Sequence, residues 1–228
     1  APSGDLDIAV NLLSLLKIDK LKDQNDVIKY VESFTKKKGL QVTVSAGIGV
    51  VSFSFPIVGQ DGEVQVDLMI TDDMKFTTWA YFSPSDTESR FKKMGFYRGI
   101  LLSTVISTVG TKVTKTFEDS DDAQELEQLF LDFSKGYGKK LTSFVGKSGK
   151  KVKTGKVLDR QFISKVPEEI ITAVFGPISS LATTISFETI MVALNSSSFP
   201  HKKAIPEIKK KVKDTLVKMG LPVPEELN

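Results

Sequence analysis

Three aspartates are the residues of this chain whose type and spacing point most directly to chemistry. Asp5 and Asp7 lie two positions apart in an apolar stretch near the start of the chain, and Asp67 lies in a second apolar stretch. If both stretches are strands, Asp5 and Asp7 point to the same face of a sheet. Singly, each acid also fits a capping residue or a solvated strand face. Together on one sheet, the three carboxylates would repel one another unless a divalent cation such as Mg²⁺ lay between them, as in enzymes that transfer phosphoryl or nucleotidyl groups.

The composition limits the other chemistries that the chain can perform. Its 228 residues are 40% hydrophobic and 26% charged, which is ordinary for one large or two small globular domains. No apolar run approaches the ~20 residues that span a bilayer, so no membrane partner is expected. The absence of cysteine excludes disulfides, thiol catalysis and Cys-ligated zinc, and it fits a cytoplasmic protein or one encoded by a phage or virus and acting inside a cell. His201, the single histidine, lies in a Pro-flanked, lysine-rich turn, which argues against a histidine-based catalytic triad.

The pattern of apolar residues in the first half of the chain predicts a sheet with flanking helices. Alternating apolar residues predict strands, and apolar residues three and four apart predict helices. In chain order the pattern predicts a strand over 4–10, a helix from Asp23 to the Lys36–Gly39 region, strands over 40–45, 50–56 and 63–70, a helical or mixed segment over 72–82, and a helix over 90–109.

The second half is expected to be mostly helical. A strand over 111–117 leads into an acidic amphipathic helix over 121–134, then a basic hairpin over 137–158, and three helices near 167–175, 186–195 and 206–219. Proline and glutamate at the starts of two of these helices are favoured there. A domain boundary near 118 divides the chain into domains 1–118 and 119–228, and the fold class is α+β.

Lysines crowd the predicted hairpin, although the net charge of the chain is only +3. A local basic field attracts phosphates whatever the net charge, so a nucleic-acid strand is one expected partner. The residues that would contact it are Lys139, Lys140, Lys147, Lys150, Lys151 and Lys153. The alternative is a solvated edge hairpin whose lysines prevent aggregation.

The acid pair and the elements that follow it resemble the DNA polymerase beta superfamily of nucleotidyltransferases. Ser3-Gly4-Asp5-Leu6-Asp7-Ile8 is similar to the first carboxylate motif of that superfamily, and Val64–Ile70 is similar to the strand that carries its third aspartate. The intervening order of helix, strand, glycine turn, strand and hairpin is also that of the family. Tyr81-Phe82-Ser83-Pro84-Ser85 is similar to the segment that lines the sugar and base pocket of DNA polymerase beta. The resemblance covers roughly residues 1–100.

This resemblance implies roles for individual residues. Asp5, Asp7 and Asp67 would hold two Mg²⁺ ions, with Mn²⁺ as an alternative metal, and a nucleoside triphosphate would bind to them. Ser3 and Gly4 would lie near its phosphates, and Tyr81, Phe82 and Ser83 near its sugar and base. Core packing of the two aromatic rings is an equal alternative. Lys92, Lys93 and Arg98 would approach the triphosphate or lie on a solvated helix face.

We therefore expect a nucleotidyltransferase palm, a mixed sheet with flanking helices, followed by a mostly helical C-terminal region. Its reaction would be Mg²⁺-dependent transfer of a nucleoside monophosphate to an acceptor hydroxyl, a nucleic-acid 3′ end being one candidate. In the family, a helix and a Gly-Ser turn that binds phosphate precede the acid pair. Either the chain begins inside a longer protein or this turn has been lost, and the absence of an initiator methionine favours the first alternative. The alternatives are a non-catalytic assembly protein that reuses the fold and a nucleic-acid-binding module. The sequence leaves the oligomeric state open.

Overall fold

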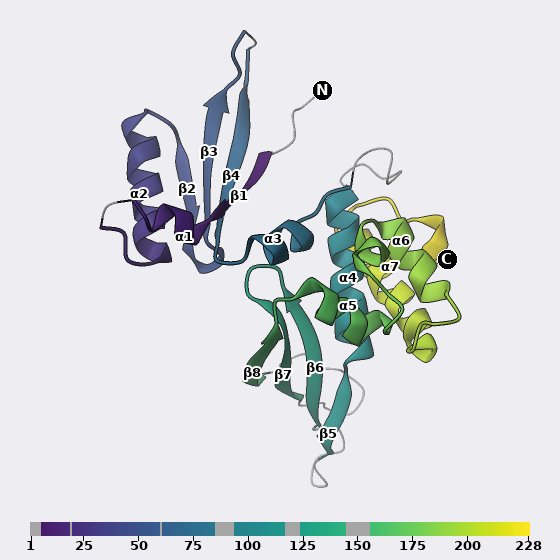
Figure 1. Cartoon of the computed structure of the whole chain (residues 1–228). Coiled ribbons are helices and arrows are strands. Elements are labelled where there is room, and N and C mark those ends of the chain that lie inside the picture. Colours follow the sequence, from purple (N-terminus) through teal and green to yellow (C-terminus); the bar gives the residue numbers. More distant parts are fainter. Residues whose placement is uncertain (1–5, 19, 60, 85–93, 117–123, 145–155) are drawn as a thin grey trace. The chain divides into compact units, whose positions relative to one another are not determined.

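The chain forms two compact units, which meet in the sequence between Thr78 and Trp79. The computed structural model describes residues 6–18, 20–59, 61–84, 94–116, 124–144 and 156–228 (Figure 1). Each unit contains a four-stranded sheet and helices, so the chain is α+β, as the sequence predicts. The division falls about 40 residues before the expected boundary near 118, because the long apolar helix over 94–109 packs with the C-terminal helices.

The first unit is built on a mixed sheet with the strand order β1-β4-β3-β2. Its strands are β1 (Leu6–Asn11), β2 (Val42–Ser45), β3 (Val50–Pro56) and β4 (Glu63–Thr71). Strand β1 runs parallel to β4, whereas β2, β3 and β4 are antiparallel neighbours. Two helices connect β1 to β2: the short α1 (Leu12–Leu15) and α2 (Gln24–Lys37).

Local capping chemistry sets the ends of these helices. The amide of Ser14 donates to the Asn11 side chain at the start of α1, and the amide of Asp26 donates to Asp23 at the start of α2. Each bond satisfies an amide that the helix itself cannot pair. Helix α2 ends at two lysines and Gly39, whose φ of 79° places it in the left-handed region that terminates helices.

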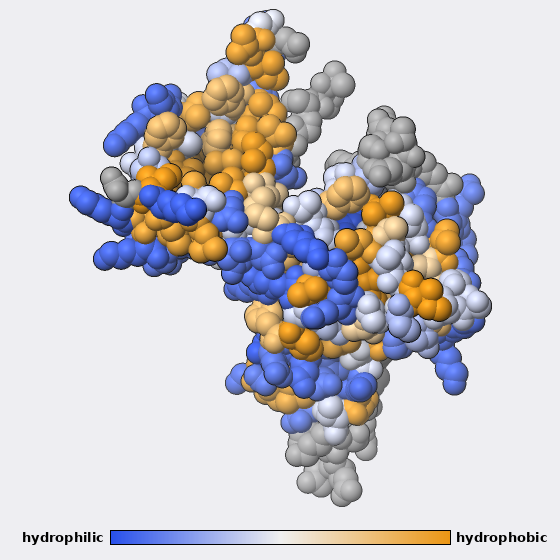
Figure 2. All heavy atoms as spheres, in the orientation of Figure 1, coloured by the Kyte–Doolittle hydropathy of each residue, from blue (hydrophilic) through white to orange (hydrophobic). Residues whose placement is uncertain are grey.

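One face of the first sheet is covered by α2. Val27 and Ile28 of the helix pack against Val51 of β3 and Ile70 of β4, and leucines of the α1 region close the edge of this core. The cover does not reach the whole face: Leu6 is 49% exposed and Phe55 is 48% exposed. Figure 2 shows hydrophobic residues gathered over β3 and β4. Because α2 packs on this face, the polar residues of the opposite face take no part in the core.

The second unit is organised around α4 (Met94–Val109). Its buried apolar residues are Tyr97, Leu101, Leu102, Val105 and Ile106, and they lie along one half of the helix. It packs against α6 (Phe187–Asn195) and α7 (Ile205–Lys218), and α5 (Pro167–Phe175) also contacts it. The ends of these three C-terminal helices lie within a residue or two of the predicted ends, so the three predicted helices are confirmed.

A short helix, α3 (Met74–Ala80), carries the boundary between the units. Its start is fixed within the first unit, where the amide of Phe76 donates to Asp73. Thr77 donates to the hydroxyl of Thr71 at the end of β4. The segment predicted to be helical or mixed over 72–82 therefore contains a helix over 74–80.

An antiparallel sheet with the order β5-β6-β7-β8 packs on α4. Its strands are β5 (Lys112–Thr116), β6 (Gln124–Asp132), β7 (Gly136–Phe144) and β8 (Lys156–Ser164). Leu129 of β6 lies directly against Gly110 at the end of α4, where a side chain on Gly110 would collide with it. Strands β7 and β8 pair as the two strands of the predicted hairpin, and β8 continues beyond the predicted end at 158 to Ser164; residues 145–155 lie outside the described residues.

Strand β6 corrects the prediction of an acidic helix over 121–134. Apolar residues of β6 serve both faces of the sheet: Leu129 packs on the α4 side, and Phe130 packs on the other side against Phe162. This double use hides the two-residue alternation that identifies a strand. Pairing with β5 on one side and β7 on the other decides the conformation, because long-range partners override local preference. In the described part of the region after 118, the helices therefore lie beyond residue 166, so the expectation of a mostly helical C-terminal region is corrected.

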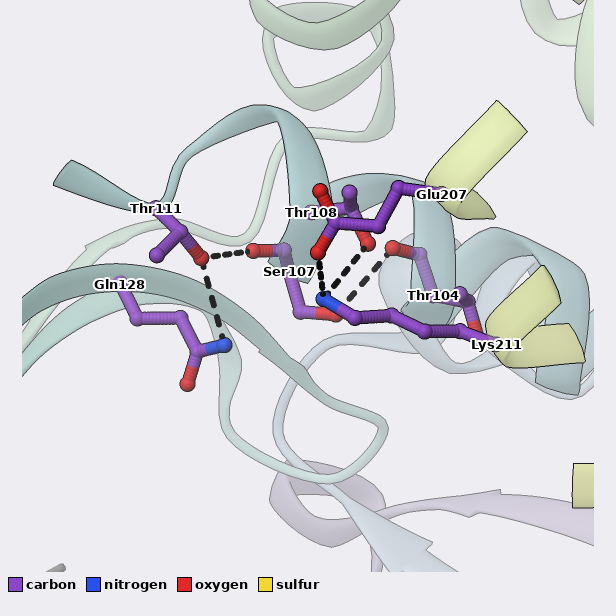
Figure 3. A network of polar contacts seen from close by, with 7 residues as sticks. All are labelled: Thr104, Ser107, Thr108, Thr111, Gln128, Glu207 and Lys211. Carbon is purple, nitrogen blue, oxygen red and sulfur yellow. Dashed lines mark hydrogen bonds and ion pairs between the residues drawn. The ribbon is translucent and has the colours of Figure 1, made fainter. Parts of the chain in front are cut away.

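A polar network joins α4, α7 and β6 (Figure 3). The ammonium of Lys211 contacts Glu207 at 2.8 Å and the Thr108 hydroxyl at 3.4 Å. Thr111 donates to the carbonyl of Ser107 at 2.6 Å, while the amide of Gln128 donates to the Thr111 hydroxyl at 3.4 Å. These bonds satisfy the polar groups at the end of α4, where the chain turns into β5.

Arg98 is buried inside the second unit, with 1% of its surface exposed. Its guanidinium donates to the carbonyls of Thr184, Ala80 and Trp79, at 2.5, 3.0 and 2.7 Å. The same group lies over the rings of Trp79 and Phe82, 5.8 and 5.9 Å from their centroids. Burial lowers the pKa of Arg98 to about 10, so the side chain is still charged at neutral pH. Neither the solvated helix face nor the triphosphate contact expected for Arg98 describes this environment.

We predict that Arg98→Met lowers the free energy of unfolding of the second unit by about 3 kcal/mol, because three buried carbonyls lose their donor. Urea denaturation followed by the fluorescence of Trp79, the single tryptophan, measures the change. Lys210→Met, at an exposed position of α7, is the control and should change stability by less than about 0.5 kcal/mol. Equal stability of the Arg98 variant and the wild type would contradict this account.

Candidate functional site

Asp7 and Asp67 lie opposite each other on neighbouring parallel strands. The register of β1 and β4 pairs Asp7 with Asp67, so both side chains leave the same face of the sheet. That face is the one not covered by α2, since Ile70 and Val51 of the opposite parity form the α2 core. Neighbouring strands lie only about 4.8 Å apart, so two carboxylates at paired positions can reach a common ligand.

Polar residues continue this arrangement across the sheet. Asp67 is paired with Ser52 of β3, and Ser52 is paired with Thr43 of β2. A row of oxygen-bearing side chains therefore runs from β2 to β1 on the open face. Asp7 is exposed and Asp67 is half-buried, so solvent or a ligand reaches the acidic end of the row.

Gln65 holds the Asp67 carboxylate from the same strand. Its amide nitrogen Nε2 donates to Asp67 Oδ1 at 2.9 Å. The two residues are two positions apart in β4 and so share a face. The contact restricts the orientation of the carboxylate without neutralising its charge. Gln65 and Ser52 are not among the predicted site residues, although the two-residue alternation of the predicted strand places Gln65 beside Asp67.

The remaining residues of the predicted first motif lie outside the described residues. These are Ser3, Gly4 and Asp5. By strand alternation Asp5 would share the face of Asp7 if β1 continued toward it, and this stays a prediction. Among the residues that the structure describes, no group of three or more histidine, cysteine, aspartate or glutamate side chains is arranged to hold a metal ion. The described part of the site supplies two carboxylates, Asp7 and Asp67.

Tyr81, Phe82 and Ser83 belong to the second unit. The ring of Tyr81 packs against Phe133 with 5.8 Å between centroids, and Phe82 lies beneath the Arg98 guanidinium. Ser83 is exposed and lies directly against Gly95 of α4. These contacts are those of the core packing that was the alternative expectation. Tyr81 nevertheless remains 38% exposed, and contact with a nucleotide stays a prediction for all three residues.

The predicted basic contacts divide between described and undescribed residues. Lys139 and Lys140 lie in β7, whereas Lys147, Lys150, Lys151 and Lys153 lie outside the described residues. Lys139 is paired with Glu127 at 3.6 Å on the face that packs toward α4. Lys140 lies on the other face, in register with Arg160 of β8. Adjacent residues of a strand point to opposite faces, so the two lysines do not form one surface.

Two further findings bear on the function. Among the described residues, no helix combines the length and hydrophobicity needed to cross a membrane. Comparisons with protein-family models, with curated proteins and with solved structures found no match to this chain. The case for a function therefore rests on the residues and geometry of the chain itself.

Proposed function

We propose that the protein is a metal-dependent nucleotidyltransferase, which moves a nucleoside monophosphate from a nucleoside triphosphate to an acceptor hydroxyl. The observation that carries the proposal is the pairing of Asp7 with Asp67 on the open face of the first sheet. The family resemblance of the two strands supports the same conclusion. A solvated strand face accounts for one exposed aspartate, whereas two acids in direct register place two anionic oxygen ligands within reach of one cation.

The residues present suit a hard divalent cation. Carboxylate oxygens are the preferred protein ligands of Mg²⁺, and Mn²⁺ accepts the same ligands. Asp7 and Asp67 would hold the metal, with Asp5 as the further ligand that the resemblance implies. Bound there, two cations would neutralise phosphate charge and lower the pKa of the acceptor hydroxyl. Gln65 would act as a positioning residue, because its hydrogen bond limits rotation of the Asp67 carboxylate.

The proposed reaction is an in-line displacement at the α-phosphorus. The acceptor oxygen forms a bond to this phosphorus and loses its proton, while the bond from the phosphorus to the bridging oxygen breaks and pyrophosphate leaves. The aspartates do not react covalently in this scheme. Their contribution is to bring the reacting groups together and to offset the charge that collects between them.

Metal binding is the first test of the site. We expect Asp67→Asn to weaken Mn²⁺ binding at least tenfold, because one of two described anionic ligands is lost. Titration of the full chain with Mn²⁺, followed by electron paramagnetic resonance of the unbound ion, measures the affinity. Asp61→Asn is the matched control, since it removes the same charge from the exposed turn between β3 and β4. Equal binding by the Asp67 variant and the wild type would exclude a metal at this pair.

Gln65 allows a subtler test of the same geometry. Gln65→Leu leaves both carboxylates in place but removes the donor to Asp67, so we expect Mn²⁺ affinity to fall about 10- to 100-fold. If Gln65→Leu bound Mn²⁺ as tightly as the wild type, the hydrogen bond would have no positioning role.

Transfer itself is measured with α-labelled nucleotides. With Mg²⁺, the four ribonucleoside and four deoxyribonucleoside triphosphates are supplied separately with an oligonucleotide acceptor, and released pyrophosphate and transferred label are both counted. Asp7→Asn and Asp67→Asn should each reduce turnover at least 100-fold, while Asp61→Asn should stay within about twofold of the wild type. Retained turnover in either site variant, or no pyrophosphate release by the wild type with any nucleotide, would overturn the proposal.

A further inference from the structure

The outer face of the second sheet carries two aromatic rings in contact across a strand. Phe130 of β6 and Phe162 of β8 meet edge to face, with 5.4 Å between ring centroids and 74° between planes. The strand between them, β7, has Gly138 at the position paired with both. A Cβ on Gly138 would lie 2.9 Å from Phe130 Cζ and 2.4 Å from the Gln161 carbonyl oxygen. The glycine therefore makes the aromatic contact possible.

Two cations lie beside these rings on the same face. Lys140 of β7 is in register with Arg160 of β8, so two positive charges occupy paired positions. The Arg160 guanidinium carbon lies 4.9 Å from the centroid of the Phe130 ring. The ring partly offsets the positive charge of Arg160. Like charges in paired positions are destabilising, and an anion between them would remove that repulsion.

This aromatic–basic face, formed by Phe130, Phe162, Lys140 and Arg160, is accessible. Strand β8 is an edge strand exposed along nearly its whole length, and Phe162 is 42% exposed. The cover by α4 lies on the opposite side, where Leu129 packs at Gly110.

The acids of these strands do not neutralise the face. By register, Glu125, Glu127 and Asp159 occupy the α4 side of the sheet. Asp132 has the parity of the aromatic–basic face, but it lies at the turn, where its carboxylate accepts from the Ser134 hydroxyl and from the amides of Ser134 and Lys135. Those bonds lower the pKa of Asp132, although its desolvation acts in the other direction. Among the described residues of β6–β8, the centre of the face is therefore positively charged.

We infer that the aromatic–basic face binds single-stranded nucleic acid, with bases stacked on the exposed ring of Phe162 and phosphates paired with Lys140 and Arg160. Nucleic acid joins planar bases to anionic phosphates at a regular spacing, and the face presents rings next to cations. A single strand is specified because the bases of a duplex are stacked on each other and closed to a ring on a flat sheet. An acidic peptide would satisfy the cations but would leave the rings without a partner.

The inference rests on the proposed function in one respect: it identifies the acceptor as a nucleic-acid strand. Its test is independent, because binding is measured without nucleoside triphosphate and with chelator in place of Mg²⁺. If the chain did not bind single strands, metal binding and nucleotide turnover would still be decided by their own assays. Failure of turnover would likewise leave the binding result standing.

The experiment is fluorescence anisotropy of the full chain with labelled 12-nucleotide oligo(dT), oligo(rU), an abasic oligomer of equal charge, and a 12-base-pair duplex. We expect the base-containing single strands to bind more tightly than the abasic oligomer and the duplex. Phe162→Ala should weaken oligo(dT) binding about 5- to 100-fold and leave abasic binding unchanged, because only the stacking contribution is lost. Arg160→Gln should weaken both single-stranded probes and lower the dependence of log affinity on log salt by about 0.7.

Two matched variants control for indirect effects. Phe34→Ala removes a phenylalanine of the first unit that is 52% exposed and also has a cation near its ring, Lys38. Lys210→Gln removes a charge from the exposed face of α7. Both should bind oligo(dT) as the wild type does. No binding to single strands at low salt, equal affinity for the duplex, or an unchanged affinity in Phe162→Ala would each overturn the inference.

Discussion

The parallel pairing of β1 with β4 is the constraint on which the candidate site depends. Only this register places Asp7 beside Asp67 on the open face. A slip of β1 by one residue would turn Asp7 to the α2 face and bring an apolar residue of β1 beside Asp67. The α2 side of the sheet opposes such a slip. Ile70 of β4 and Val51 of β3 are buried beneath Val27 and Ile28, so the apolar core fixes β4 and leaves the acids on the polar face. The chemistry of one face is therefore positioned by the packing of the other.

The second unit depends on a different kind of constraint, a buried charge. An apolar residue at position 98 could fill the same space, but it could not join three separate segments by hydrogen bonds. Arg98 binds the carbonyls of Trp79, Ala80 and Thr184, so α4, the end of α3 and the turn near Thr184 must all be in place before the charge is paired. The Trp79 indole adds a bond of 2.9 Å to the Thr184 hydroxyl, which draws the same segments together. A charge that is satisfied only in the complete unit favours that arrangement over looser packings.

Local signals explain what the sequence could predict. Asp23 before α2 and the Pro-Glu starts of α5 and α7 mark helix ends through short-range chemistry, and the structure contains those helices. The predictions failed where distant segments decide. Strand β6 has apolar residues on both faces, so its spacing also fits a helix, and only its neighbours β5 and β7 make it a strand. The burial of Arg98 required carbonyls 18 and 86 residues away in the sequence, which no local pattern reveals.

The sequence indicated the candidate site only through the spacing of its aspartates along the chain. The separation of two residues between Asp5 and Asp7, and the apolar flanks of Asp67, indicate strands, but they do not say which strands are neighbours. β1 and β4 are separated by more than 50 residues and pair in parallel, which requires a crossover connection, here one that contains α2, β2 and β3. Gln65 could have been assigned to the site, since its place two residues before Asp67 needs no long-range information.

Each of the two sheets has a pair of like-charged residues at paired positions on neighbouring strands, acidic in the first sheet and basic in the second. Asp7 faces Asp67 across parallel strands, and Lys140 faces Arg160 across antiparallel strands. Each repulsion costs only about 0.2–1 kcal/mol, which a folded domain tolerates easily. The fold therefore does not need a ligand at either place in order to form. A site binds more tightly when its like-charged groups are held together before the ligand arrives, because folding has then already met the entropic cost of ordering those side chains. Backbone pairing accomplishes this ordering here, for the proposed cation on the first sheet and for the proposed phosphate chain on the second.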